Sequence, residues 1–548
     1  MDHAKLQQER LTSTKLEPYD MITAVTERSI NAQLQAMHSN NESLRRILLT
    51  SPDTDDDWTG LNAELSAPTV QLKIGTEDRI VLFFVNIKSA TLKYREIKGK
   101  KVEEKTCDFS DSRIAVSVNL TFETAAFTTL PPDVQKRLAV LNNYSINQLL
   151  IDFGSTSLAR LDTKNSNVYE KLETIHLRAA AEFNIFMNMY FNALAGDHNV
   201  SVLHYIPLAS AETDRQKYPM PTIPPTKLTF QNIPFLTSAS DKGSLNDNNM
   251  LVYLQMTDKD ATLPERLLEI SANWVVPPPS DKEAERYDGT VALSRKIFLD
   301  GWLLPKLAEF NRDSTWIVKE AWSEDTGFLN LGTVIHMDGH MGWTGATESD
   351  IKWNAITADT VDQWAKDKVP GFAGDWYKFY NSNNKDDNGV IERVYQKGTT
   401  LNYCFIPESY ASNGKCEILV AGVTQVEFYV NVDLIPSKAK VTGTWSTKLV
   451  LDGVNDGELV ITAENITPKI DKEVNDAIFH GGDIDNLINA AESGLKNLNM
   501  TSLLSKITKV FRDGWDFILP GAADFYISKA VFNKRKDLLC ELKYRELA

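Results

Sequence analysis

A short strand that runs directly into an apolar helix is the feature that most constrains this chain. Residues 287–294 predict an apolar strand that ends at Ser294, whose hydroxyl is suited to cap the next helix. Apolar residues then recur at helical spacing, with Phe298 and Trp302 on a neighbouring stripe. Because they cover most of the circumference, we expect this helix to be buried on several sides. Pro305 should kink or end it.

The same pattern occurs near the N-terminus. Residues 19–25 predict a strand, Thr26 a cap, and the residues from Glu27 onward a helix with Ile30, Leu34 and Met37 on one face. Both units open with Tyr-Asp. They predict an internal repeat, with chance similarity as the alternative.

Strict alternation of apolar and polar residues marks the clearest strands, at 114–122 and 426–434. One apolar and one polar face are typical of an antiparallel sheet that is covered on one side. Further strands are predicted at 70–74, 80–87, 90–94, 250–256, 327–341, 352–354, 445–451 and 459–463. The predicted fold class is therefore α+β.

Helical periodicity replaces alternation over 168–194, where Leu172, Ile175, Ala179, Phe183, Phe186, Tyr190 and Leu194 share a face. Met187 and Met189 give this helix an adaptable apolar surface, as in sites that accept flexible apolar ligands. Packing against the sheet is the alternative interpretation, and a ligand groove would be an unfilled part of that core. Two more helices are predicted at 484–498 and 503–517.

The predicted organisation is a polar tail at 1–16, a first half at 17–286, and a second half at 287–548. The boundary falls before Tyr287 or shortly after Phe310. An aromatic, glycine-rich stretch near 362–416 is predicted to be an insertion in the second half.

The net charge of −16 argues against nucleic-acid binding and against electrostatic docking on anionic membranes. Four scattered cysteines do not form a disulfide framework, although Cys404 and Cys416 could face each other across a hairpin. The N-terminus lacks the apolar core of a signal peptide, and no apolar run reaches the length of a transmembrane segment. We therefore expect a cytoplasmic protein, with unconventional release as the alternative.

Catalytic and metal-binding motifs of specific spacing are absent from the sequence. His336 and His340 are four residues apart, which suits a metal only on a helix, and the neighbouring glycines favour a turn or a strand. The acidic loop after Asp53 has Trp58 where a calcium loop needs glycine. No metal, cofactor or catalytic residue is predicted.

Three segments resemble the clostridial forty-seven-kilodalton proteins, which are encoded beside botulinum-type neurotoxins and belong to the tubular lipid-binding (TULIP) superfamily. They are 19–34, 249–257 and 292–307, and the motifs at 225–230 and 519–521 fit the same pattern. The resemblance implies elongated, highly curved antiparallel sheets wrapped around long helices. It also implies an apolar groove that can take lipid, and it covers nearly the whole chain after the tail.

The first functional hypothesis is a non-enzymatic carrier or accessory protein that binds a lipid or another hydrophobic ligand. The predicted lining residues are Phe183, Phe186, Met187, Tyr190, Phe298 and Trp302. One alternative is an accessory factor of a toxin or secreted complex, with Trp376, Tyr377 and Phe379 as an exposed protein contact. The other alternative is an isomerase or cyclase that uses the apolar cavity.

Overall fold

The computed structural model shows a chain built from two compact units. It describes residues 2–544 except 54–55, 57, 75–78, 127, 129, 131–134, 136–143, 156–160, 174–176, 210–224, 238–246, 259, 266, 280–281, 283–284, 326–332, 370, 372, 390–391, 410–414, 433–434, 454–458, 465–467, 476–480 and 497–524. Unit 1 comprises Met1–Leu293, Asp516–Ser528 and Cys540–Ala548, and unit 2 comprises Ser294–Trp515 and Lys529–Leu539. The chain thus leaves unit 1 between Leu293 and Ser294, directly after the strand at the start of the predicted second half.

The two strand–cap–helix units of the sequence supply neighbouring strands. Their strands β1 (Met21–Thr26) and β10 (Gly289–Leu293) pair antiparallel, with Thr23 opposite Val291. This pairing explains why β10 groups with unit 1 and not with the residues that follow it. The six-stranded sheet has the order β20-β21-β10-β1-β9-β8. Its other strands are β8 (Lys227–Ile233), β9 (Met250–Met256), β20 (Phe525–Phe532) and β21 (Leu538–Tyr544).

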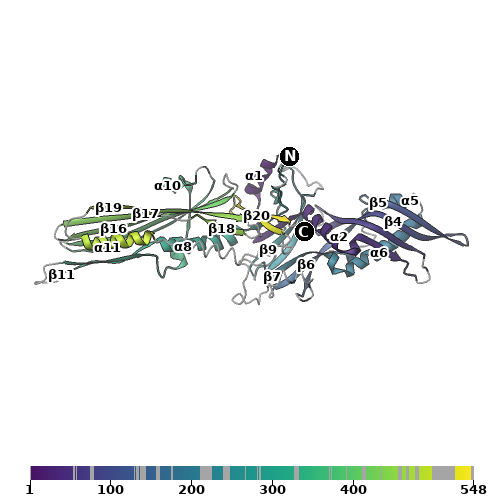
Figure 1. Ribbon diagram of the computed structural model, residues 1–548, viewed down its shortest axis with the longest axis horizontal. Coiled ribbons are helices and arrows are strands. Elements are labelled where there is room, and N and C mark those ends of the chain that lie inside the picture. The colour runs from purple at the N-terminus through teal and green to yellow at the C-terminus, as the bar shows by residue number, and fades with distance from the viewer. Residues whose placement is uncertain are drawn as a thin grey trace. The chain divides into compact units, whose positions relative to one another are not determined.

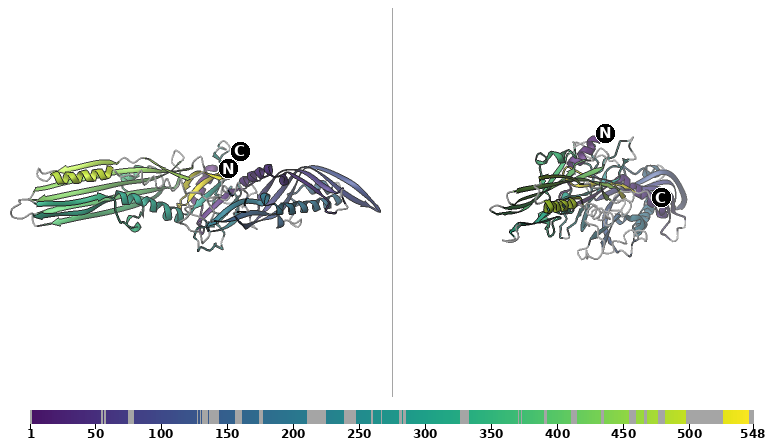
Figure 2. Two further views of the ribbon diagram at one scale, coloured as in Figure 1. Left: turned by 60° about the horizontal axis from the view of Figure 1, so that its bottom comes forward. Right: turned by 60° about the vertical axis from the view of Figure 1, so that its left-hand side comes forward.

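A second antiparallel sheet in unit 1 has the order β2-β3-β4-β5-β6-β7 and curves around a long helix (Figure 1). Its strands are β2 (Arg46–Thr50), β3 (Gly60–Leu72), β4 (Ile80–Lys98), β5 (Lys101–Ala125), β6 (Tyr144–Asp152) and β7 (Val202–Ala209). Strand β4 joins the two strands predicted at 80–87 and 90–94. The predicted helix at 168–194 is described as α5 (Val168–Glu173) and α6 (Leu177–Gly196). Helix α6 contacts β2, β3 and β4 and lies along the curved sheet (Figure 2).

The prediction of a polar tail at 1–16 is wrong. Helix α1 (His3–Ser13) occupies this range, and Asp2 caps it by accepting a hydrogen bond from the backbone N–H of Lys5. Leu6 packs with Phe235 and Val276, while the Arg10 side chain is completely buried. The predicted helix after Thr26 is confirmed as α2 (Glu27–Asn40).

We expect the stability of unit 1 to depend on the protonation of Glu27. Burial raises the pKa of Glu27 to about 7, a backbone hydrogen bond from Leu72 (2.8 Å) opposes this shift, and the charge of Asp247 adds to it. The unfolded chain therefore loses this proton first as the pH rises. The contribution of protonated Glu27 to the free energy of unfolding is complete below about pH 4. It is lost as the pH rises through about 7.

The Glu27→Gln variant should lose this part of the pH dependence, because a neutral amide oxygen can still accept from Leu72. Urea unfolding should show that the free energy of unfolding of the wild type falls between pH 5 and pH 8 by on the order of 3 kcal/mol because of this group. The variant should lack this decrease. Equal decreases in both proteins would contradict the assignment.

Unit 2 is built on an antiparallel sheet of long strands in the order β13-β14-β15-β16-β17-β18, with β19 also paired to β17. The strands are β13 (Asn354–Ile356), β14 (Gly374–Asn388), β15 (Arg393–Pro407), β16 (Cys416–Val432), β17 (Ile435–Gly453), β18 (Leu459–Ala463) and β19 (Lys469–Asn475). A separate hairpin consists of β11 (Trp316–Asp325) and β12 (Thr333–Met341), and helix α11 (Gly481–Lys496) contacts β12 and β17. The predicted helix at 503–517 and the motif at 519–521 lie outside the described residues.

The helix after Ser294 begins differently from the prediction. The Ser294 carbonyl, and not its hydroxyl, accepts from the N–H groups of Ile297 and Phe298. The first turns form the π-helix η6 (Lys296–Leu303), which continues as α8 (Leu304–Ser314). Pro305 does not end the helix. It lies at the second residue of α8, where the π-helical turns pass into the α-helix.

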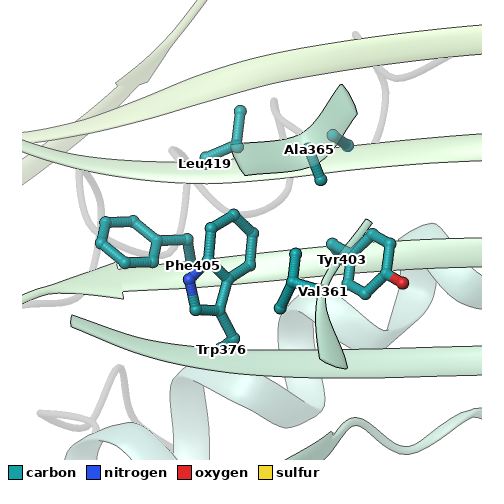
Figure 3. Close-up of a cluster of buried hydrophobic side chains, with 7 residues drawn as sticks. Val361, Ala365, Trp376, Tyr403, Phe405 and Leu419 are labelled. Carbon is teal, nitrogen blue, oxygen red and sulfur yellow. The ribbon is translucent and has the colours of Figure 1, made fainter. Parts of the chain in front are cut away.

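Two expectations for residues 362–416 require correction. The predicted insertion contains β14 and β15, which pair with each other over their whole length and are integral to the sheet. Trp376, Tyr377 and Phe379 are 2–5% exposed, so they do not form a contact patch. Trp376 packs in a cluster with Val361, Tyr403 and Phe405, seen in Figure 3. The prediction failed because β14 is covered on both faces along this stretch.

The remaining short helices are α3 (Glu42–Arg45), η3 (Phe153–Ser155), α7 (His198–Ser201), α9 (Glu348–Ile351), η7 (Ala358–Thr360) and α10 (Gln363–Lys366).

Candidate functional site

Helix α6 presents four of the predicted lining residues to the interior of unit 1. Phe183 and Met187 are 0% exposed, Phe186 is 1% exposed, and Tyr190 is 6% exposed. The ring of Phe183 lies edge-on to the ring of Phe109 on β5, with 5.6 Å between centroids. The three- and four-residue spacing in the sequence therefore identified the buried face of this helix.

Tyr190 carries the polar group of this face. Its hydroxyl donates to the carbonyl oxygen of Ser43 (2.9 Å), and burial raises the pKa of the phenol, so the ring stays neutral. Phe191 is also buried, with its ring 5.9 Å from that of Tyr190 and stacked on Phe153. Phe191 was not predicted from the sequence, because it lies one position outside the helical spacing of Phe186, Tyr190 and Leu194.

The remaining two predicted residues belong to unit 2. The rings of Phe298 and Trp302 stack along η6 with 5.5 Å between centroids, and Phe298 also contacts Phe532 at 6.0 Å. Phe298 is fully buried and Trp302 is 8% exposed. The six predicted residues thus form two groups in two units, four on α6 and two on η6.

An open pocket of about 490 Å³ lies in unit 1 where β4 and β5 approach β8. Its lining residues are Arg79, Ile80, Asn119, Leu120, Thr121, Phe230 and Leu267. The Phe230 ring packs edge-on against Phe122, with centroids 5.1 Å apart. Leu267 is 41% exposed and forms part of the rim.

Arg79 is the charged residue of this pocket, and two contacts with strand β8 hold its side chain. Its guanidinium lies 5.5 Å from the centroid of the Phe230 ring, and its Nη2 donates to the Thr229 hydroxyl (3.2 Å). A cation at the edge of an apolar pocket is suited to an amphipathic ligand with an anionic or polar end. Ile80, Leu120 and Phe230 lie in segments that the sequence marked as strands or motifs. Neither Arg79 nor Leu267 was predicted, and no sequence pattern indicated that these segments come together.

Groups that could support metal chemistry do not converge in the described part of the chain, where no three His, Cys, Asp or Glu side chains cluster. His336 and His340 lie on strand β12, as their glycine neighbours predicted, and the His336 ring stacks on Trp322 at 3.8 Å. Asp56 uses its carboxylate to accept from the backbone of Trp58 and Thr59. The neighbouring acidic positions 55 and 57 lie outside the described residues.

The buried thiols are not arranged as a pair. Cys404 lies opposite Val420 and Cys416 lies opposite Leu451, so the idea that they face each other across a hairpin is wrong. Burial raises the pKa of Cys416 to about 12 and the pKa of Cys404 well above its usual value, which keeps both thiols protonated and unreactive.

Within the described residues, every helix is too short or too polar to span a lipid bilayer. What the described residues define is an α+β protein whose antiparallel sheets are long and, in unit 1, curved around a helix.

No protein-family model matches the sequence, and no curated protein matches it. Several solved structures are similar to it. The crystal structure of P47 of Clostridium botulinum E1 is similar at 12% identity, covers 96% of this chain and 99% of that chain, and gives a TM-score of 0.41. P47 from Clostridium botulinum A2 is similar at 11% identity, with 97% and 98% covered and a TM-score of 0.41. The crystal structure of a lipopolysaccharide binding protein is similar at 10% identity, with 97% and 100% covered and a TM-score of 0.32.

Proposed function

We propose that this protein binds a lipid or another hydrophobic ligand in an apolar groove, and that it acts as a carrier or accessory protein without changing the ligand chemically. The observation that supports this function best is the pocket at Phe230 in unit 1. Its volume of about 490 Å³ lies in the range of small-molecule sites. Apolar side chains from β4, β5 and β8 line it, and an arginine stands at its edge.

The lining favours an acyl or other aliphatic group over a polar ligand. Leu267 is 41% exposed and Ile80 is partly exposed, whereas Leu120 and Phe230 are each 2% exposed and complete the lining. Removing exposed apolar surface from water contributes about 25 cal/mol per Å². The exposed guanidinium of Arg79 would meet the polar end of the same molecule. A fatty acid or a lipid with an anionic head group combines both features.

The segment that borders the pocket adds exposed apolar surface. Leu263, Leu267 and Ile270 are 36–41% exposed on one short stretch of chain. Clustered apolar side chains on a surface mark binding sites more often than isolated ones do. We propose that Leu267, the residue of this stretch that lines the pocket, covers the aliphatic part of the ligand at the pocket rim.

The four predicted residues on α6 enter this proposal as the apolar interior of unit 1, whereas Phe298 and Trp302 on η6 are buried in unit 2. Met187 and Phe186 give α6 a surface that can repack around an acyl chain. A ligand chain longer than the pocket would displace side chains of this kind more easily than β-branched ones.

We expect Leu267→Asp to weaken ligand binding strongly while the protein stays folded. Leu267 is exposed, so the substitution places a carboxylate at the pocket rim without opening the core. We expect lipid extraction of the purified wild type to yield acyl lipid. A fluorescent fatty acid should bind the variant at least ten times more weakly than the wild type.

Leu263→Asp is the matched control, because Leu263 is similarly exposed on the same stretch but is not among the pocket residues. It should bind the fatty acid as the wild type does. A wild type that carries no lipid and binds no fatty acid would refute the proposed function. Equal binding by the wild type and Leu267→Asp would refute the assignment of the pocket.

A further inference from the structure

A larger groove, of about 800 Å³, lies in unit 2 on the seven-stranded sheet. Strands β15, β16, β17 and β19 contribute its lining. The residues are Arg393, Tyr395, Glu427, Phe428, Tyr429, Lys438, Ala439, Lys440, Glu473, Val474 and Asn475. It is separate from the Phe230 pocket, and the proposed lipid binding does not use it.

Two tyrosines form the floor of this groove. Tyr395 lies directly opposite Tyr429 in the register, and Tyr429 lies opposite Lys438. Residues directly opposite each other on neighbouring strands project from the same face of the sheet, so the two phenol rings lie side by side on this face and form an aromatic platform, with Arg393 over both rings. Behind it, Val394 and Phe428 are 0–1% exposed and belong to the core, which gives the platform a rigid support.

Cations from the same sheet hold the rings in place. The Arg393 guanidinium lies 5.5 Å from the Tyr395 centroid and 5.7 Å from the Tyr429 centroid. The Lys438 ammonium lies 5.4 Å from the Tyr429 centroid. Asp386 fixes Arg393 through two hydrogen bonds of 3.0 and 2.8 Å. The platform is therefore preorganised before any ligand arrives.

The charges around the platform balance. Arg393, Lys438 and Lys440 are cationic, Glu427 and Glu473 are anionic, and Arg393 is already paired with Asp386. A phosphorylated or otherwise strongly anionic ligand would meet the two glutamates, and a cationic ligand would meet the two lysines. A neutral ligand that both donates and accepts hydrogen bonds would satisfy all of these groups.

We infer that this groove is a binding site for a neutral oligosaccharide. Sugar hydroxyls both donate and accept, as the mixture of lysine, glutamate, asparagine and tyrosine requires. The flat C–H face of a pyranose ring matches the tyrosine platform, since tyrosine supplies rigid amphipathic contact area at low entropic cost. The balanced charges disfavour an acidic lipid as the ligand. The aromatic platform favours a ligand with a flat apolar face over a simple ion.

The test is binding of the full-length protein to an array of neutral and acidic oligosaccharides, followed by calorimetry with the neutral oligosaccharide that binds best. We expect neutral oligosaccharides to bind. Tyr429→Ala should weaken binding at least tenfold, and Tyr429→Phe, which keeps the ring, should retain most of the affinity. Tyr380→Ala is the control, because Tyr380 is 58% exposed on β14 of the same sheet but does not line the groove.

Three results would overturn the inference. The first is an absence of neutral binders on the array. The second is a preference for sulfated or sialylated sugars over neutral ones. The third is equal affinity of Tyr429→Ala, Tyr380→Ala and the wild type. Loss of lipid binding in Leu267→Asp has no bearing on this site, so the two proposals fail independently.

Discussion

Replacing Arg10 with methionine is expected to destabilise unit 1 by about 3–5 kcal/mol, as the loss of one partner from a buried charged network does. The Arg10 side chain is 0% exposed. Its guanidinium donates to the Trp274 carbonyl (2.9 Å), the Thr290 hydroxyl (3.2 Å) and Glu541 (3.4 Å), and it lies 5.1 Å from the Tyr287 centroid. Methionine keeps much of the volume but removes the cation beside the buried Glu541 carboxylate. It also removes one of the two donors to the Trp274 carbonyl, to which the Thr290 hydroxyl donates as well (2.7 Å).

Chemical unfolding followed by hydrogen exchange of the β1 amides measures this effect within unit 1. Lys5→Met on the same helix is the control. Its side chain is 68% exposed and 3.9 Å from Glu9, so its removal should cost less than about 1 kcal/mol. If Arg10→Met unfolds at the same urea concentration as Lys5→Met, α1 does not anchor unit 1.

Arg10 also explains why the sequence did not predict helix α1. The segment has few apolar residues, and its interior contact is made by one leucine and one arginine. Periodicity of apolar residues cannot reveal a helix whose buried face is charged. The partners of Arg10 are 264 to 531 residues away in the chain, and no local pattern reports such pairings.

Where the alternation or the helical spacing of apolar residues was strong, the sequence alone predicted the strand or helix. The strand predicted at 114–122 lies within β5, where Val116, Val118 and Leu120 are buried and the residues between them are partly exposed. The helical spacing selected Phe183, Phe186 and Tyr190 on the buried face of α6. One face of each of these elements packs against apolar neighbours, and that contact requires only apolar side chains. Their periodicity is therefore the signature of their packing.

The pockets were not predictable in the same way. Ile80, Leu120, Phe230 and Leu267 each occur in a different segment, and only the tertiary fold brings them together. The tyrosine platform depends on register, because a shift of β15 against β16 by one residue would place Tyr395 and Tyr429 on opposite faces. Register is set by turns and by the whole sheet, not by the two tyrosines.

The second large effect is expected in unit 2, where Lys536→Met should destabilise the fold by about 3 kcal/mol. The Lys536 side chain is 0% exposed, and its Nζ lies 2.8 Å from Glu408 and 3.4 Å from Asp375. The Glu408 side chain is 26% exposed and the Asp375 side chain is 39% exposed. Water can therefore partly replace the lost cation, so the expected loss of stability lies at the lower end of the range for a buried ion pair.

Lys534→Met provides the control, since Lys534 is an exposed residue of the same turn between β20 and β21. Unfolding followed by hydrogen exchange of the β15 amides should separate the two variants. Lys536 joins the turn to Asp375 on β14 and to Glu408, the residue that follows β15. Glu408 is 128 residues earlier in the chain than Lys536. If both lysine variants unfold alike, the turn is held by the network of Asn533 and Asp537 instead, in which the Asn533 side chain accepts from the Asp537 N–H at 2.9 Å.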